Sequence, residues 1–304
     1  MKSCRRQCGQ CAVRRFGQSL AVVAALSGLD LACPNAAFGQ ANTVFRWSRG
    51  DGGETKNAAE KLAEPLVTDR PDFTEASSTV GLGVFQIEGG YTYSYDANAT
   101  SSTTGHSYPE TLFRYGVFAE WLEARVAWNY ASVGETEFGG NRTSDAGAEP
   151  LYLGLKIALT GQEGFLPEMA LMPQMTVPTG PKQFGGDETL PGLGWLYGWD
   201  LNDWLSFGGE TQANRALDET TANPYLEFAQ SLTVGYQLHD RIGAYTEWFV
   251  IAPDGADVDH TQNYFNTGLT FLLNDNLQFD IRYGVGLNEA ADDYFTGSGL
   301  AWRL

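Results

Sequence analysis

The stretch Phe85-Gln-Ile-Glu-Gly-Gly-Tyr-Thr-Tyr-Ser-Tyr95 decides the fold of this chain. Every second residue from Phe85 to Tyr95 is apolar, aromatic or glycine, and the residues between them are Gln, Glu, Gly, Thr and Ser. Successive side chains of a β-strand point to opposite sides of the sheet, so a period of two marks a strand with two different faces. The stretch therefore predicts a strand with one apolar face and one polar face.

The same alternation recurs along the chain and predicts twelve strands in all. The weakest of them contains Pro173, and proline removes a hydrogen bond from the ladder, so we expect a bulge or an interruption there. The predicted strands cover residues 84–95, 109–118, 122–132, 148–160, 167–177, 191–200, 204–213, 224–237, 241–251, 262–273, 276–286 and 294–303.

The connections alternate between short and long. Tight turns are expected at residues 119–121, 201–203, 238–240 and 274–275, and longer loops include residues 96–108, 133–147 and 178–190. Short turns at one end and long loops at the other are typical of transmembrane barrels. A soluble sandwich also alternates, but here the apolar faces are long enough to cross a bilayer, and aromatic residues gather toward the strand ends. The sequence predicts an all-β fold, a closed antiparallel transmembrane β-barrel of about 12 strands, with short periplasmic turns and longer external loops.

Composition agrees with this class. The 304 residues carry 19 Lys and Arg against 37 Asp and Glu, a formal net charge of −18, which argues against a nucleic-acid-binding protein. Aromatic residues make up 13% and there are 36 glycines, which argues against disorder and for many turns. No later stretch approaches 18 uninterrupted apolar residues, so we expect no transmembrane helix.

Residues 1–39 have the layout of a secretory signal peptide, with a basic start, an apolar stretch and small residues near Gly39. Its removal would lower the net charge from −18 to −22 and take away every cysteine, because all four lie between Cys4 and Cys33. Cys8-Gly-Gln-Cys11 has the spacing of zinc and redox motifs, but we interpret it as part of the leader. We expect a periplasmic N-terminal segment at 40–82, the barrel at 83–304, and a location in the bacterial outer membrane.

Charged residues fall on the polar faces of the predicted strands, which point into the barrel. Both signs occur, so the charges fit either of two interpretations: paired charges that fill a narrow interior, or a polar pore lining that sets selectivity. The candidate pore-lining residues are Glu88, Glu110, Arg114, Glu123, Arg125, Lys156, Glu210, Glu227, Glu247, Asp280 and Arg282.

Two neighbouring stretches resemble a known family. The chain reads Thr68-Asp-Arg-Pro-Asp-Phe-Thr-Glu75 and then Val84-Phe-Gln-Ile-Glu-Gly-Gly-Tyr-Thr-Tyr93. This pairing resembles the opening signature of a family of outer-membrane β-barrel transporters associated with the meta-pathway of phenol degradation. The resemblance is specific over residues 68–93 and rests on strand pattern beyond them. It implies an outer-membrane barrel with a transport function.

The segment Asp69–Glu75 is too charged to face lipid as a strand. Our hypothesis is that it enters the periplasmic mouth of the barrel and acts as a partial plug, with Asp69, Arg70, Asp72 and Glu75 meeting the lumen charges. The alternative is a solvated linker.

The predicted function is an outer-membrane channel or transporter for small solutes, hydrophobic or aromatic compounds among them, through a charged lumen. The alternatives are a barrel that anchors or receives without conducting, and a phospholipase-like enzyme. We favour no enzyme, because the three histidines, His106, His239 and His260, lie in separate predicted turns and loops and no GxSxG motif occurs. We expect no catalytic residue, cofactor or metal. The expected partners are outer-membrane lipid, a small-molecule solute and, during biogenesis, the barrel-assembly machinery.

Overall fold

The structure is a computed structural model that describes residues 42–49, 56–181, 187–218 and 221–304. The chain divides into two compact units, Met1–Phe38 and Gly39–Leu304, and every described residue belongs to the second. The predicted signal peptide with its four cysteines lies outside the described residues. Neither helix of the described part is long and apolar enough to cross a membrane.

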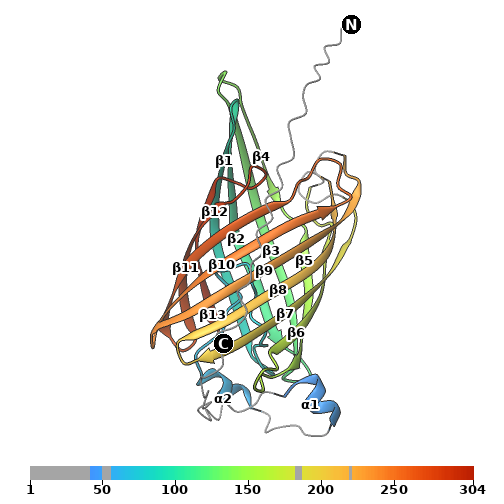
Figure 1. The fold of residues 1–304 in the computed structure, drawn as a ribbon. Coiled ribbons are helices and arrows are strands. Elements are labelled where there is room, and N and C mark those ends of the chain that lie inside the picture. Colours follow the sequence, from blue (N-terminus) through green and yellow to red (C-terminus); the bar gives the residue numbers. More distant parts are fainter. Residues whose placement is uncertain (1–41, 50–55, 182–186, 219–220) are drawn as a thin grey trace, which may run out of the picture. The chain divides into compact units, whose positions relative to one another are not determined.

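Thirteen antiparallel strands of the described part form one sheet that closes on itself (Figure 1). Strand β1 pairs with both β2 and β13, so the first and last strands meet and leave no open seam. Closure is what a bilayer requires, because lipid cannot satisfy the backbone groups of a sheet edge. The predicted fold class, a closed antiparallel transmembrane barrel, is confirmed. The elements are α1 (Val44–Arg49), α2 (Ala58–Leu62), β1 (Phe85–Ala97), β2 (Ser101–Gly116), β3 (Leu122–Glu137), β4 (Arg142–Ala148), β5 (Leu151–Thr160), β6 (Glu168–Val177), β7 (Leu190–Asn202), β8 (Leu205–Leu217), β9 (Pro224–His239), β10 (Ile242–Asp254), β11 (Gln262–Asn274), β12 (Leu277–Gly286) and β13 (Tyr294–Arg303).

Twelve of these strands make the barrel, and β4 is an addition. Strand β3 pairs with β5 over its first half and with β4 over its second half, and β4 and β5 are separated only by Glu149 and Pro150. The sequence predicted a single strand at 148–160 here. The structure begins that strand at Leu151 and places β4 beyond it, because the chain before Pro150 continues to pair with β3.

Strand β6 runs through Pro173 without a break. Pro173 pairs with Leu193 of β7. On the β5 side, Gly154 pairs with Gln174 and Ile157 pairs with Leu171, in the same register. The positions between these two pairs are unpaired. Proline has no N–H to donate, so the interruption that the sequence predicted is confined to one side of one strand.

The connections that the sequence predicted to be long are longer than the tight turns, but two of them are not loops. The predicted loop at 96–108 is a continuation of β1 and β2 that turns at residues 98–100, and the predicted loop at 133–147 is a continuation of β3 that returns as β4. Both stretches keep pairing past the height of the barrel and form the tall ribbon in Figure 1. Their Thr, Ser and Gly content suits a two-sided polar strand as well as a loop, so composition alone could not separate the two.

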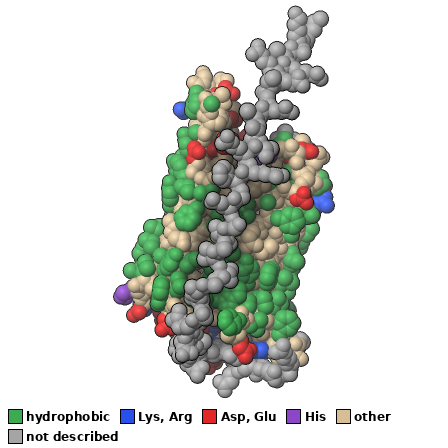
Figure 2. All heavy atoms as spheres, viewed as in Figure 1, with side chains coloured by type: hydrophobic (Ala, Val, Ile, Leu, Met, Phe, Trp, Pro, Cys, Tyr) green, Lys and Arg blue, Asp and Glu red, His purple; other side chains and the backbone are tan. Residues whose placement is uncertain are grey.

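The alternation of faces follows the sequence. On β7, Leu193 and Trp195 are 46% and 43% exposed on the outside, while Leu196 is fully buried inside. Figure 2 shows hydrophobic side chains along the visible outer wall and charged side chains gathered toward its two ends. The outward belt is thus the lipid-facing surface that a transmembrane barrel needs.

Both helices attach to the end of the barrel that carries the short turns. Glu120, in the turn between β2 and β3, accepts a hydrogen bond from the backbone N–H of Asn42, just before α1. At the end of α2, the carbonyl of Leu62 accepts from the Asn276 side chain, and beyond the helix the N–H of Leu66 donates to the carbonyl of Asp275. The C-terminus lies at the same end (Figure 1). By the barrel convention this is the periplasmic end, and from here the chain enters the lumen.

Candidate functional site

Residues 66–82, which we call the lumen segment, run from the short-turn end into the barrel. They form no strand, so their backbone groups need other partners inside the protein. Many of the backbone N–H groups donate hydrogen bonds to glutamate carboxylates of the barrel wall. The N–H groups of Asp69, Thr74, Glu75 and Val80 donate to carboxylates on four different strands, Glu88 of β1, Glu247 of β10, Glu210 of β8 and Glu123 of β3. These glutamates are fully or almost fully buried.

Asp69 is the centre of an ionic cluster on one side of the lumen. Its carboxylate lies 3.2 Å from Arg114 of β2, 2.5 Å from Arg125 of β3 and 2.8 Å from Lys156 of β5. Burial alone would raise the pKa of Asp69, but these three cations outweigh it and hold the pKa well below its usual range. Asp69 is therefore ionised while the segment occupies the lumen.

Glu75 enters the same cluster from the other side. Its carboxylate lies 2.7 Å from Arg125 and 3.6 Å from Lys156. Burial is the largest influence on its pKa and raises it; Arg125 opposes this, and the charge of Asp69 adds to it, so the net direction is upward. Of these two carboxylates of the segment, Asp69 is thus the one whose ionised form the cations favour.

Arg70 lies across the seam where the barrel closes. Its guanidinium is 2.8 Å from Glu110 of β2 and 3.5 Å from Asp280 of β12, so it spans β1 and β13 between them. Gly90 of β1 and Gly299 of β13 are register partners, and a Cβ on either would come within 2.4 Å of the guanidinium group. The two glycines therefore leave the notch in which Arg70 rests.

The opposite side of the lumen carries acids without matching bases. Glu247 accepts from the N–H groups of Phe73 and Thr74 at 2.8 and 2.7 Å, from the Thr74 hydroxyl and from Asn266. Asp72 lies near Glu247; burial raises its pKa most, and the neighbouring Glu247 charge raises it further. Among the described residues no Lys or Arg forms an ion pair with Asp72 or Glu247.

An aromatic cluster lies beside this acidic side, inside the barrel. Phe73 stacks on Phe249 of β10 with ring centroids 4.7 Å apart, and Phe249 stacks on Tyr264 of β11 at 4.8 Å. Phe295 of β13 meets Tyr264 edge-on at 5.9 Å, and Ala291, from the loop between β12 and β13, packs on the same cluster. The lumen therefore offers apolar aromatic surface as well as charge.

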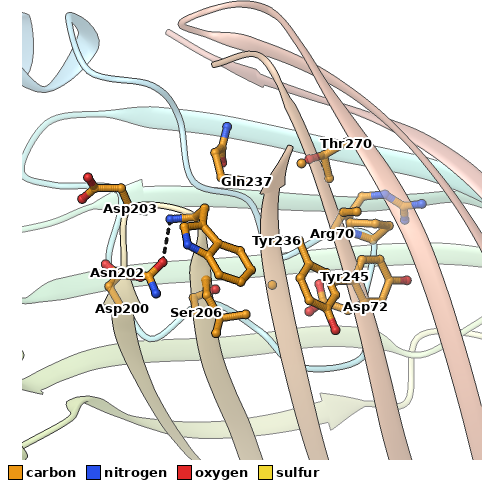
Figure 3. Close-up of a pocket in the computed structure, with 16 residues that line it drawn as sticks. Arg70, Asp72, Asp200, Asn202, Asp203, Ser206, Tyr236, Gln237, Tyr245 and Thr270 are labelled. Atoms are coloured by element: carbon orange, nitrogen blue, oxygen red, sulfur yellow. Dashed lines mark hydrogen bonds between the residues drawn. The ribbon is translucent and has the colours of Figure 1, made fainter. Parts of the chain in front are cut away.

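A cavity of about 250 Å³ lies between the lumen segment and the short-turn end of β7–β11 (Figure 3). Arg70, Pro71 and Asp72 line it from the segment. Its wall includes inward side chains of β7, β8, β9, β10 and β11, namely Asp200, Ser206, Gln237, Tyr245 and Thr270. Its lining is mainly polar, in contrast to the aromatic cluster.

The structure places the eleven candidate pore-lining residues on the lumen side of the barrel and brings ten of them around the lumen segment or into contact with one another. Glu227 is the exception, because it lies near the long-loop end of β9, where the Tyr225 hydroxyl donates to it at 3.4 Å. No group of three or more His, Cys, Asp or Glu in the described part of the chain is placed to hold a metal ion.

Sequence reasoning missed several residues of this site. It did not single out Phe73 or Thr74, although both lie inside the quoted motif, and it assigned aromatic residues to the lipid face. The missed signal was the register of β10, where Phe249 shares its parity with Glu247 and therefore points inward. Gly299 likewise carried a signal, since it follows the same parity as Arg303 on β13.

Fold and lumen together define the class: this is an outer-membrane β-barrel whose own N-terminal segment occupies its interior. The chain belongs to the family described as "Putative MetA-pathway of phenol degradation", which matches residues 68–304. The match begins at the first residue of the motif Thr68–Glu75 and confirms the family resemblance seen in the sequence.

One solved structure shares the architecture, and others give weaker matches. An outer membrane channel from Pseudomonas putida F1 superposes with a TM-score of 0.59 at 12% identity, covering 77% of this chain and 99% of that one. The NanC porin gives a TM-score of 0.43 at 11% identity, covering 72% and 100%, and the DcaP channel of Acinetobacter baumannii gives 0.37 at 9%, covering 79% and 100%. At these identities the first likeness shows the barrel fold alone. A comparison with curated proteins gave no match.

Proposed function

We propose that this protein is an outer-membrane channel or transporter for small solutes, and that residues 66–82 act as its plug. One observation carries the proposal: a segment without secondary structure crosses a closed barrel and is held there by side-chain contacts with the wall, through Asp69, Arg70, Thr74 and Glu75. A barrel that served only as an anchor could fill its lumen with wall side chains alone.

Hydrophobic or aromatic compounds are the solutes that we propose. The cluster of Phe73, Phe249, Tyr264 and Phe295 supports this, because an aromatic ring could stack where Phe73 stacks now. The wall charges support passage of polar groups through the same lumen, so amphipathic aromatic solutes fit both features.

The test is single-channel conductance and liposome swelling, with the intact chain compared with a variant that lacks residues 66–78. We expect the deletion to raise conductance severalfold. A deletion variant that folds into a barrel and conducts no better than the intact chain would refute the plug.

The second candidate is a non-conducting anchor or receptor barrel. It is favoured by the way in which the charges on the β2–β5 side satisfy one another: Arg114, 1% exposed, pairs with Glu88, Glu123 and Asp69. Such a network can be structural filling. Liposomes containing this barrel would not swell in any solute, with or without residues 66–78.

We do not propose an enzyme. His106 faces outward, where its ring lies 2.8 Å from the Tyr91 hydroxyl, whereas its neighbour Ser107 binds Asn129. Adjacent residues of a strand point to opposite faces, so the two cannot form a nucleophile and base pair. Phospholipase activity abolished by His106→Ala or His260→Ala would overturn this.

We also propose export through a signal peptide at residues 1–39 and insertion by the barrel-assembly machinery. The last strand ends with Leu300, Trp302 and Leu304 on its outer face, at 47–51% exposed, which suits a terminal strand that reaches its place against lipid.

A further inference from the structure

Residues 70–75 form a loop across the lumen whose two ends meet. The N–H of Ala76 donates to the Asp69 carboxylate at 3.0 Å, which closes the loop at its base. The base is bound to the wall on the β2–β5 side, where Asp69 meets Arg114, Arg125 and Lys156, and where Lys156 also donates to the carbonyl of Ala76 at 2.7 Å.

The tip of the loop reaches the opposite wall. Its residues, Phe73 and Thr74, contact β9 and β10: the Thr74 hydroxyl oxygen lies 2.6 Å from that of Ser231 and 2.6 Å from the Glu247 carboxylate. The tip contributes no ion pair. It is held by hydrogen bonds that water can replace and by the stack of Phe73 on Phe249, which another ring can replace.

Two different environments lie on either side of the tip contact. Toward the external loops is the aromatic cluster, in which Phe73 takes part and which Ala291 of the last loop covers. Toward the short-turn end is the polar cavity of about 250 Å³, lined by Asp72 and, on β7 and β8, by Asp200 and Ser206 (Figure 3). The contacts of Phe73 and Thr74 with Phe249, Glu247 and Ser231 separate these two environments.

We propose that solutes cross on the β8–β11 side of the lumen, and that the tip of the 70–75 loop is the gate. The tip leaves Glu247 and Ser231 while the base stays on the β2–β5 side. The asymmetry of charge sets this direction. Moving the base would take Asp69 away from three buried cations and leave Lys156 without either of its carboxylate partners, Asp69 and Glu75, whereas moving the tip breaks no ion pair. The inference rests on the proposed channel function and assigns its route and its gate residues.

A reversible disulfide bond between the tip and the wall tests the gate. In a chain without its leader no cysteine remains, so the double variant Thr74→Cys, Ser231→Cys contains a single possible disulfide. The two hydroxyl oxygens that the sulfurs would replace are 2.6 Å apart, close to a disulfide bond length of about 2.0 Å. Oxidation should lower conductance by about tenfold or more, since it removes the open population, and reduction should restore it. The single variants Thr74→Cys and Ser231→Cys should not respond to oxidant.

A second measurement does not depend on the engineered disulfide. Ser206→Cys lines the cavity, whereas Ala170→Cys lies on the inner face of β6 among buried apolar side chains. A charged methanethiosulfonate reagent should reduce conductance in Ser206→Cys and leave Ala170→Cys unchanged. Equal block of both, or of neither, contradicts a route on the β8–β11 side.

The variant lacking residues 66–78 separates the two levels of failure. If it does not conduct, the channel function fails and the gate fails with it. If it conducts while the oxidised double-cysteine variant conducts as well as the reduced one, the channel stands and the gate is overturned. If the intact chain does not conduct while the deletion variant does, the proposal that the tip alone moves to open the channel is also overturned.

Discussion

The Nζ of Lys156 lies 2.8 Å from the Asp69 carboxylate, and both side chains are almost completely buried between β5 and the lumen segment. A lysine on the wall thus neutralises an aspartate that no strand carries. This contact joins two parts of the chain that are 87 residues apart. It makes the position of the segment depend on the charge of the wall.

Lys156→Met should release the base of the lumen segment. Removing one partner of a buried pair costs up to about 3–5 kcal/mol, and here the Asp69 carboxylate would lose one of its three cations while it keeps Arg114 and Arg125. The strands remain paired, so we expect a folded barrel with higher conductance in planar bilayers. The matched control is Arg241→Met, which breaks an exposed pair with Asp275 at 3.4 Å and should cost about 0–1 kcal/mol. Unchanged conductance in Lys156→Met would contradict the proposal that the Lys156–Asp69 pair holds the base of the lumen segment in place.

Gly299→Ala should displace Arg70. The new Cβ would lie 2.3 Å from the Arg70 Nε, and the end of a long side chain is what must move. We expect the loss of the Glu110 and Asp280 contacts to weaken segment binding by about 1.5–3 kcal/mol, the range for hydrogen bonds to charged groups.

The control for this substitution is Gly161→Ala, where a Cβ meets nothing within 4 Å. Residues that act through one contact are not additive, so Gly299→Ala should have no effect on conductance in an Arg70→Ala background. Full additivity of the two effects would show that Gly299 acts in some other way.

The sequence predicted the barrel well because lipid imposes a pattern. Alternation as in Phe85–Tyr95 follows directly from one face in lipid and one in the lumen, and the parity of each strand then assigns Glu88 or Lys156 to the inside. What the sequence could not show is where the inward groups meet along the barrel axis, since that depends on register and on the path of a segment without secondary structure.

The aromatic cluster illustrates this limit. Phe249 and Tyr264 were hidden by the expectation that a lumen is polar, and only their parity with Glu247 and Asn266 marks them as inward. Phe73 is a single residue in a charged motif, and nothing in its neighbours states that it will stack on a strand more than 170 residues away. The ends of β1 to β4 were missed for a related reason, because a polar strand beyond the membrane has no apolar face to reveal it.

The ribbon of β3 and β4 should be dispensable for the barrel. Residues 135–146 are mostly exposed, and Phe138 at its tip is 64% exposed. Replacing residues 135–143 by Asn-Gly joins the register partners Gly134 and Ser144 through a two-residue hairpin turn. We expect conductance to remain unchanged and thermal stability to stay within about 0.5 kcal/mol. Loss of conductance would mean that the ribbon contributes to the route.

Asp72 and Asp69 should give the channel opposite responses to pH. Burial, reinforced by Glu247 of β10 and by Asp69, raises the pKa of Asp72 in the bound segment, while the Thr233 hydroxyl of β9 opposes it. Tyr245 of β10 faces the same carboxyl group. Release returns the pKa of Asp72 to its ordinary value, so the bound segment takes up a proton between the two values and its binding weakens as pH rises through the higher one.

Asp69 works in the other direction. Burial opposes its ionisation, but Arg114, Lys156 and Arg125 lower its pKa, so its contribution to binding is complete above the ordinary value near pH 4 and is lost as pH falls further. Conductance should therefore be lowest in mild acid and rise both toward alkaline pH and below about pH 4, in recordings from about pH 2 to 9. Asp72→Asn should reduce the alkaline rise, to which Glu75 also contributes because its pKa is raised in the bound segment, and should leave the acid limb, which belongs to Asp69. An alkaline rise of the same size in Asp72→Asn would assign the titration to another group.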